Sequence, residues 1–141
     1  MTKHSYTTHS IDELRDLAVR FLESVPEKSI VCLDAEMGAG KTTFTQFVLQ
    51  AMGIENPNGS PTYSIVNEYV SPLFGTVFHL DLYRIETVEE LYDIGLEEIL
   101  YSNNFVFIEW PSRAEMLIPD DAIYLTIRLG ENGERVFSWE S

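Results

Sequence analysis

Cysteine and long apolar runs are both scarce in this sequence. Its 141 residues include a single cysteine, Cys32, so no intrachain disulfide can form. Cys32 lies within the apolar run Ser29–Leu33, where we expect a small, buried hydrophobic residue. No apolar stretch approaches the ~18 residues of a membrane-spanning helix, and residues 1–5 lack the apolar segment of a secretory signal. We therefore expect a cytoplasmic protein.

Positive charge is also scarce. Nine Lys and Arg residues stand against 23 Asp and Glu residues, which gives a net charge of −14. A chain this acidic repels a phosphate backbone, so strong direct binding to nucleic acid is not expected. After Lys28 the sequence has one further lysine, Lys41. The cations beyond it are four scattered arginines: Arg84, Arg113, Arg128 and Arg135.

The order of predicted elements indicates an α/β protein. Hydrophobic residues make up 45% of the chain, enough for one domain over residues 1–141 with one sizeable core. Strands and helices alternate early, whereas hairpins occupy the middle and the end of the chain, so we expect an α/β fold with a mixed, largely parallel sheet, flanking helices and a C-terminal β-hairpin. The predicted elements are a helix from Ser10 to about Ser24, strand Ser29–Leu33, a helix to about Met52, a hairpin over 63–82, a helix over 87–100 interrupted near Gly95, strand Phe105–Ile108, and strands Ile123–Leu129 and Glu134–Trp139.

A glycine-rich segment between the first predicted strand and the second helix carries the strongest chemical signal. It consists of Gly38, Ala39, Gly40, Lys41, Thr42 and Thr43. A strand that ends in such a turn and opens into a helix points backbone N–H groups at an anion, and the helix N-terminus adds partial positive charge. In this pattern the lysine reaches the β- and γ-phosphates and the following hydroxyl, here Thr42, ligates Mg²⁺. The segment predicts a nucleotide phosphate site and, together with the α/β order of elements, a P-loop NTPase fold.

One position departs from the full G-x-x-x-x-G-K-[ST] pattern. Ala35 stands where the pattern has its first glycine. If that position requires a positive φ, alanine costs on the order of 1 kcal/mol. The amides that hold phosphate begin at Gly38, so the prediction of a phosphate site does not depend on this position.

Two acidic residues end predicted strands. Asp81 follows the apolar run that begins at Val77, and Glu109 follows Phe105–Ile108. In parallel sheets the carboxyl ends of the strands are where ligands bind, and a P-loop NTPase needs a carboxylate to hold Mg²⁺ or to orient the attacking water. Both acids are therefore candidates for these roles, although each alone is also compatible with an ordinary acid leaving a strand.

Several further residues have a functional and a plain structural interpretation. Thr62, in the loop that follows the second helix, is a candidate γ-phosphate sensor or part of a simple turn. Arg84 and Arg113 are candidates for phosphate contacts or for surface ion pairs, and Trp110 is either core or a contact for a ligand or partner. The acidic helical segment is a solvated face or a docking surface for a basic partner; its acids are Glu86, Glu89, Glu90, Asp93, Glu97 and Glu98.

Four strings together resemble the bacterial TsaE (YjeE-type) P-loop ATPases of tRNA threonylcarbamoyladenosine modification. They are Gly38–Thr43, Ser60–Tyr63, His79–Arg84 and the pair Glu109-Trp110, in family order and spacing. The P-loop string is shared with many families, whereas H-x-D-x-Y-R followed by E-W is far more specific. The resemblance extends from about Thr8 to Arg135.

This resemblance implies an ATPase that uses ATP and Mg²⁺ and acts with the TsaB and TsaD proteins. It implies that Gly38–Thr43 holds the phosphates, that Lys41 serves catalysis as well, and that Thr42 and Glu109 ligate Mg²⁺. It further implies that Asp81 supports activation of water and that Trp110 belongs to a functional loop. Additional nucleotide contacts are implied at Ser10, Arg113 and Arg135.

Other functions remain open at this level. A small-molecule kinase needs a lid with several basic residues, and the four scattered arginines after the P-loop favour it less. A translation-type GTPase is disfavoured because no lysine follows Lys41 to form a guanine-reading N-K-x-D string. A nucleotide-gated binding module with little turnover uses the same site residues as an ATPase.

Overall fold

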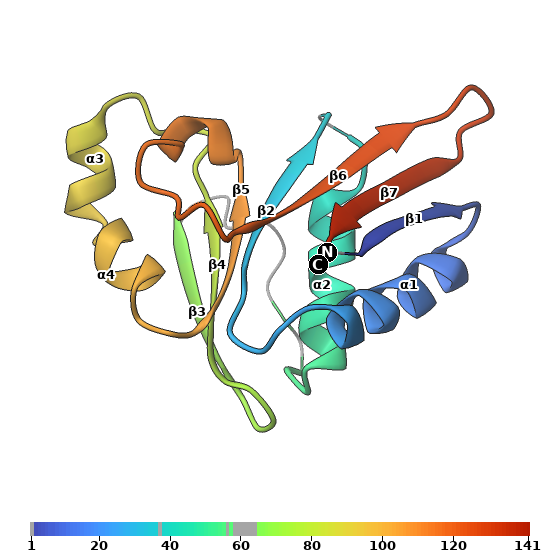
Figure 1. The fold of residues 1–141 in the computed structure, drawn as a ribbon, viewed down its shortest axis with the longest axis horizontal. Helices are drawn as coiled ribbons and strands as arrows, with labels where there is room; N and C mark the ends of the chain where they lie inside the picture. The colour runs from blue at the N-terminus through green and yellow to red at the C-terminus, as the bar shows by residue number, and fades with distance from the viewer. Residues whose placement is uncertain (1, 37, 56, 58–64) are drawn as a thin grey trace.

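The computed structural model describes residues 2–36, 38–55, 57 and 65–141, and these form a single sheet with helices on both faces (Figure 1). The sheet has seven strands in the order β1-β7-β6-β2-β5-β4-β3. The strands are β1 (Lys3–Thr8), β2 (Ile30–Ala35), β3 (Val66–Ser71), β4 (Gly75–Asp81), β5 (Phe105–Glu109), β6 (Ile123–Leu129) and β7 (Arg135–Glu140). The helices are α1 (Ile11–Ser24), α2 (Lys41–Ala51), α3 (Val88–Asp93), α4 (Leu96–Leu100) and the 3₁₀ turn η1 (Pro111–Ala114).

The sheet is mixed, as predicted, and its parallel part lies at the centre. The pairs β2–β5, β2–β6 and β4–β5 are parallel. The pairs β3–β4, β6–β7 and β1–β7 are antiparallel and lie toward the two edges. The predicted central and C-terminal hairpins are both present, whereas β1 was not predicted. The carboxyl ends of the central parallel strands therefore meet at one edge of the molecule.

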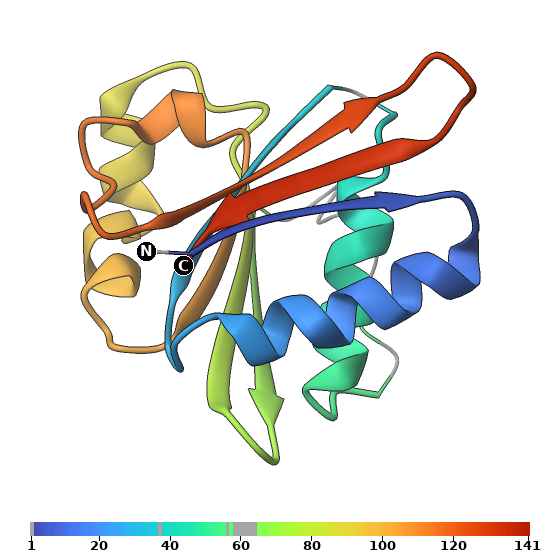
Figure 2. The same cartoon turned by 45° about the vertical axis from the view of Figure 1, so that its right-hand side comes forward.

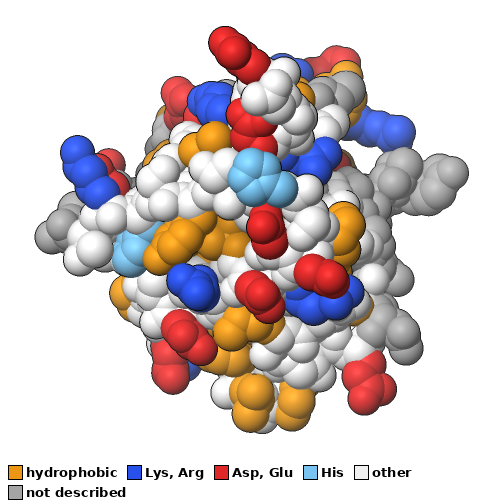
Figure 3. Space-filling model, turned by 90° about the vertical axis from the view of Figure 1, so that its right-hand side faces the viewer, with side chains coloured by type: hydrophobic (Ala, Val, Ile, Leu, Met, Phe, Trp, Pro, Cys, Tyr) orange, Lys and Arg blue, Asp and Glu red, His pale blue; other side chains and the backbone are white. Residues whose placement is uncertain are grey.

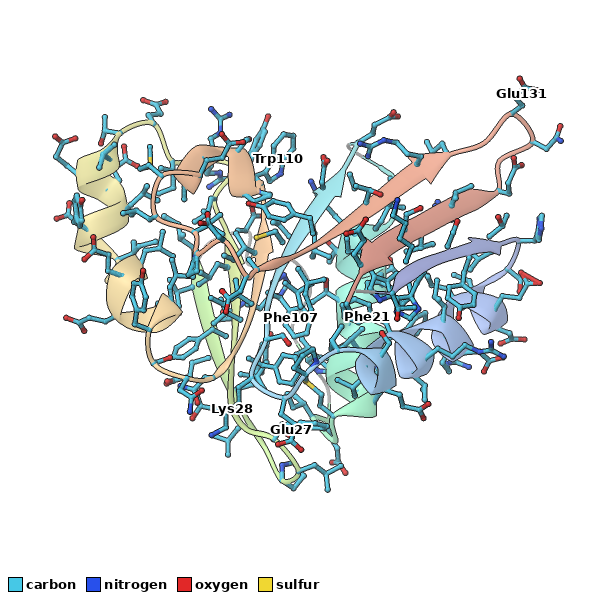
Figure 4. The ribbon with its side chains drawn as sticks, in the orientation of Figure 1. Phe21, Glu27, Lys28, Phe107, Trp110 and Glu131 are labelled. Atoms are coloured by element: carbon cyan, nitrogen blue, oxygen red, sulfur yellow. The ribbon has the colours of Figure 1, made fainter. Side chains whose placement is uncertain are left out.

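Helices cover the two faces of the sheet in separate groups. α1 and α2 pack on one face, and α3, α4 and η1 lie on the other (Figures 1 and 2). Residues that alternate along β2 enter different cores: Val31 and Leu33 face α1 and α2, whereas Cys32 faces α3 and α4. Phe21 of α1 and Phe107 of β5 lie in the first core (Figure 4). Cys32 is fully buried, as the sequence predicts, and burial raises the pKa of its thiol to about 12 against a smaller opposing effect of its hydrogen bond with Tyr124.

The helix ends follow the local signals in the sequence. The Ser10 hydroxyl accepts a hydrogen bond from the backbone N–H of Glu13 and caps α1, and Thr87 caps α3 in the same way. Gly53 has a φ of 87° directly after the end of α2, and Gly95 with a φ of 74° separates α3 from α4. These left-handed positions are sterically open to glycine, which explains why both helices stop there.

The surface is acidic without one dominant patch on the face that carries the start of α1 and the β6–β7 hairpin. Figure 3 shows that acidic, basic and apolar side chains are interspersed on this face. Within the described part of the chain, none of the helices is long and apolar enough to cross a membrane.

Candidate functional site

The candidate site lies where the carboxyl ends of β2, β4 and β5 meet the N-terminus of α2 (Figure 1). The loop from β2 to α2 turns through Gly38 and Gly40, which have φ values of 82° and 96°. Gly40 is the N-cap of α2, and Lys41, Thr42 and Thr43 form the first turn of the helix. Free N–H groups at a helix start favour binding of an anion.

Ala39 anchors the glycine-rich turn to the interior. Its side chain is fully buried in the core between α2 and the sheet, and its backbone N–H donates to the carbonyl of Glu36 over 3.1 Å. A Cβ added at Gly38 would meet no atom within 4 Å, so space next to this glycine is open. The turn is thus anchored in the core through Ala39, whereas the space beside Gly38 is open.

Ala35 causes no backbone strain at the first position of the P-loop pattern. It is the last residue of β2 and pairs with Ile127 of β6. The described non-glycine residues with positive φ are Lys28, Asn103 and Trp110. The condition under which alanine would be costly is therefore not met, because extended backbone is open to any residue.

Thr42 and Glu109 meet in the site although 67 positions separate them in the sequence. The Thr42 hydroxyl donates to Oε1 of Glu109 over 3.3 Å. Glu109 ends β5 directly beside β2, with its side chain 1% exposed, and Thr42 lies in the first turn of α2. The predicted pair of metal ligands is thereby brought together.

Lys41 is surrounded by carboxylates and an aromatic ring. Partial burial lowers the pKa of Lys41, while the charges of Glu109, Asp81 and Asp34 act in the opposite direction. Its ammonium nitrogen lies 4.0 Å from the centre of the Trp110 ring, within the range of a cation–π contact. The amine is therefore held at the site by charge on one side and by an indole on the other.

Trp110 has a conformation that is rare for a large side chain. Its φ is 61° and its ψ is 54°, in the left-handed region, at the N-cap of η1. Its ring lies 4.9 Å from that of Tyr83, which follows β4. Figure 4 shows Trp110 at the end of the sheet where the strands terminate, opposite Glu27 and Lys28. Such outliers cluster at functional sites, which agrees with the predicted functional loop.

Asp81 and Glu109 end neighbouring parallel strands in register. Asp81 of β4 pairs directly with Glu109 of β5. Oδ1 of Asp81 accepts a hydrogen bond of 3.0 Å from the backbone N–H of Tyr83, and the carboxylate interacts electrostatically with Lys41. Both predicted acids therefore lie at the same edge as the P-loop.

His79 is a site residue to which the sequence analysis assigned no role. Its Nε2 lies 2.5 Å from Oε2 of Glu109, and its side chain is completely buried. The signal was present, since His79 stands two residues before Asp81 and strand residues two apart share a face. Its use required knowledge that β4 pairs with β5, and the sequence did not specify this pairing.

Arg135 lies against the P-loop. A Cβ added at Gly40 would be 3.4 Å from Nε of Arg135, and this buried Nε has no hydrogen-bond partner within the described ranges. Arg135 also pairs with Thr8 of β1, so the start of β7, the end of β1 and the P-loop are close together. Ser10, two residues after Thr8, is exposed and caps α1.

The remaining candidates are less closely tied to the P-loop. Arg113 is exposed on η1, and its backbone N–H donates to the carbonyl of Trp110. Arg84 is exposed after β4. Thr62 lies outside the described residues, as does the rest of Ser60–Tyr63.

The donor set fits Mg²⁺. Adjacent ligands of an octahedral Mg²⁺ at about 2.1 Å lie about 3 Å apart, close to the 3.3 Å between Thr42 Oγ1 and Glu109 Oε1. The described residues hold no cluster of three or more His, Cys, Asp or Glu able to bind a metal.

Known proteins with related sequences share one description. The family model "Threonylcarbamoyl adenosine biosynthesis protein TsaE" matches residues 8–137. A TsaE protein from Rickettsia bellii is 34% identical over 129 residues, which cover 91% of this chain and 88% of the relative. A TsaE protein from Bacillus subtilis is 30% identical over 138 residues, which cover 96% and 84%. Both are named tRNA threonylcarbamoyladenosine biosynthesis proteins.

A solved structure has the same fold. The crystal structure of Bacillus subtilis YdiB matches this chain with a TM-score of 0.80 at 22% identity. The match covers 98% of this chain and 84% of that one.

Proposed function

This chain belongs to the TsaE family, and from that membership we propose that it serves tRNA threonylcarbamoyladenosine biosynthesis by binding and hydrolysing ATP. We further propose that it does so together with the TsaB and TsaD proteins, as the family resemblance implies. Nucleotide binding follows from the P-loop, whereas hydrolysis and the preference for adenine nucleotides are further parts of this proposal.

The observation that carries this proposal is the contact between Thr42 and Glu109. A threonine at the first turn of a P-loop helix and a buried strand-end carboxylate lie 3.3 Å apart, as two ligands of one Mg²⁺ would. When bound, Mg²⁺ would neutralise charge on the β- and γ-phosphates. Glutamate side chains are rarely buried in an ordinary core. The carboxylate of Glu109 is 1% exposed beside a glycine-rich turn, which favours a functional role.

The other residues have assignable tasks around the phosphates. The amides of Gly38–Thr43 and the amine of Lys41 hold the phosphate oxygens. Arg135, whose Nε would lie 3.4 Å from a Cβ added at Gly40, is assigned a contact with the same nucleotide. Asp81, in register with Glu109, orients the attacking water. Ser10 and Arg113 are assigned to the periphery of the nucleotide.

The proposal predicts a preference for adenine nucleotides and turnover that depends on partners. ATP should displace a fluorescent ATP analogue at least about tenfold better than GTP, because the chain has no N-K-x-D string to read guanine. Phosphate release should be measured with and without the TsaB–TsaD complex. Equal competition by GTP would contradict the choice of adenine, and no release in either condition would contradict hydrolysis.

A nucleotide-gated binding module is the second candidate, and the Lys41–Trp110 contact favours it. Lys41 would have to leave the indole ring, 4.0 Å away, in order to reach a phosphate. Nucleotide binding would then free the Trp110 and Tyr83 ring pair, of which Tyr83 is 46% exposed. Partner binding that requires ATP but continues with a non-hydrolysable analogue, without turnover, would favour this function over the ATPase.

A further inference from the structure

The carboxylate of Glu109 is held at both oxygens by residues from two different elements. Oε1 accepts a hydrogen bond from Thr42 of α2 over 3.3 Å, and Oε2 lies 2.5 Å from Nε2 of His79 on β4. An ionised carboxylate only accepts hydrogen bonds, so Nε2 carries the proton in this pair. Of the two oxygens, Oε1 contacts Thr42 and Oε2 contacts His79.

His79 has no other task that its surroundings explain. Its side chain is completely buried, and its second ring nitrogen, Nδ1, has no hydrogen-bond partner in the described part of the chain. The alternation of β4 places His79 on the same face as Val77 and Asp81, and His79 pairs with Phe107, two residues before Glu109. Burying an imidazole with one unpartnered nitrogen is costly, and its bond to Glu109 is what offsets this cost.

A carboxylate that is hydrogen-bonded at one oxygen only can adopt more than one orientation, and the contact with His79 restricts the orientation of Glu109. The terminal torsion of a glutamate is broad and roughly two-fold, so a singly bonded carboxylate can rotate or offer both oxygens to a metal. A ring nitrogen on Oε2 fixes the plane of the carboxylate. Partners that orient metal ligands in this way typically change metal affinity 10- to 100-fold when they are removed.

We propose that His79 is the positioning residue of the metal site: it binds Oε2 of Glu109 and thereby keeps Oε1 beside Thr42 for Mg²⁺. This inference rests on the proposed role of Thr42 and Glu109 as metal ligands. In this proposal His79 acts only through Glu109. Its effect should therefore appear only in the part of nucleotide affinity that Mg²⁺ provides.

The test compares three substitutions of His79 by titrating a fluorescent ATP analogue in Mg²⁺ and in EDTA. His79→Leu removes the donor and should lower affinity in Mg²⁺ about 10- to 100-fold while affinity in EDTA changes less than about twofold. His79→Gln carries an N–H at about the reach of Nε2 and should restore affinity in Mg²⁺ to within about threefold. His79→Asn is also polar but its amide is too short, so it should behave like His79→Leu. The Asn and Gln pair keeps the test decisive if the leucine variant does not fold.

A matched control separates positioning from mere stability. Val77→Ala removes a fully buried side chain from the same face of the same strand and should lower the thermal midpoint without changing the ratio of affinities in Mg²⁺ and EDTA. Equal losses in Mg²⁺ and EDTA for His79→Leu, or no loss, would overturn the positioning role while the metal site stands. A wild-type protein that binds equally well with and without Mg²⁺ would overturn the metal assignment and this inference with it.

Discussion

Lys41 is the lysine of the candidate phosphate site. It is one of three lysines in the chain, and the other two, Lys3 and Lys28, lie far from it in sequence. Its amine contacts the Trp110 ring and is influenced by Glu109 and two other carboxylates. No second lysine is available to replace it at the phosphates.

Replacing Lys41 should abolish ATP binding. Lys41→Ala removes charge-assisted hydrogen bonds to two phosphates, so affinity for a fluorescent ATP analogue should fall at least about 100-fold. The fold should survive, as circular dichroism and thermal unfolding would report. Lys3→Ala is the matched control, because it removes the same charge from a side chain that is 87% exposed and should leave affinity unchanged. Unchanged affinity in Lys41→Ala would refute the P-loop assignment.

Glu109 and Asp81 should differ in what they contribute. Glu109→Ala should weaken nucleotide binding only in the presence of Mg²⁺, since the lysine and amide contacts do not need the metal. Asp81→Ala should keep affinity for Mg·ATP and lose turnover, the result expected of a group needed chiefly in the transition state. Equilibrium titration and phosphate release in the presence of TsaB and TsaD measure the two effects.

The same experiment needs a control for folding, because Glu109 is buried against His79. Glu109→Gln keeps the size of the side chain and an oxygen that can accept a hydrogen bond, so it separates loss of the charge from a packing defect. The division of roles would be reversed if Asp81→Ala lost Mg²⁺-dependent affinity while Glu109→Ala lost only turnover.

At the scale of the elements, α2 is held at both ends. Its start is the glycine-rich turn, and its end packs on the turn between β3 and β4. The Ser71 hydroxyl donates to the carbonyl of Met52 over 2.6 Å. A Cβ added at Gly53 would lie 2.9 Å from Cγ of Pro72, too close for a rigid ring to avoid. The end of α2 thus packs directly against the turn between β3 and β4.

Gly53→Ala should therefore cost more stability than its backbone angle alone implies. A positive φ costs alanine roughly 1 kcal/mol, and the contact with Pro72 should add at least about 1 kcal/mol. Gly75→Ala is the matched control, because Gly75 has a φ of 76° with no atom within 4 Å of an added Cβ. Urea unfolding of both variants gives the two free energies of unfolding. Equal losses would show that the Pro72 contact does not restrain α2.

At the scale of the whole molecule, charge determines which partners can bind directly. The net charge is −14. Lys and Arg side chains that neutralise phosphates supply most non-specific affinity for nucleic acid, and here the acids outnumber them. The face in Figure 3 shows basic side chains dispersed among acidic ones.

The protein alone should therefore not bind tRNA measurably. We expect no change in fluorescence anisotropy of labelled tRNA at protein concentrations up to about 100 μM in physiological salt, which spans the usual range of non-specific dissociation constants. Any contact of this chain with tRNA should require its partners. Salt-dependent binding by the isolated chain at micromolar concentrations would contradict this expectation.

The sequence by itself determined most of the elements and the glycine-rich segment that predicts a phosphate site. Local rules suffice for these, because apolar periodicity, capping hydroxyls and turn glycines act within a few residues. The helix that begins at Ser10, the helix that ends near Met52, the helix over 87–100 and the segment Gly38–Thr43 were all predicted in this way. β1 was missed, because this edge strand consists largely of polar residues, half of them exposed, and has no apolar residues in alternation.

Only the tertiary structure decided which of the candidate residues meet. The parallel register of β4 with β5 places Asp81 beside Glu109 and turns His79 toward its carboxylate. The pairing of β7 with β6 and β1 brings Arg135 to Gly40, 95 residues earlier in the chain. The physical reason is that strand order and register are set by the packing of whole layers, which no short stretch of sequence specifies.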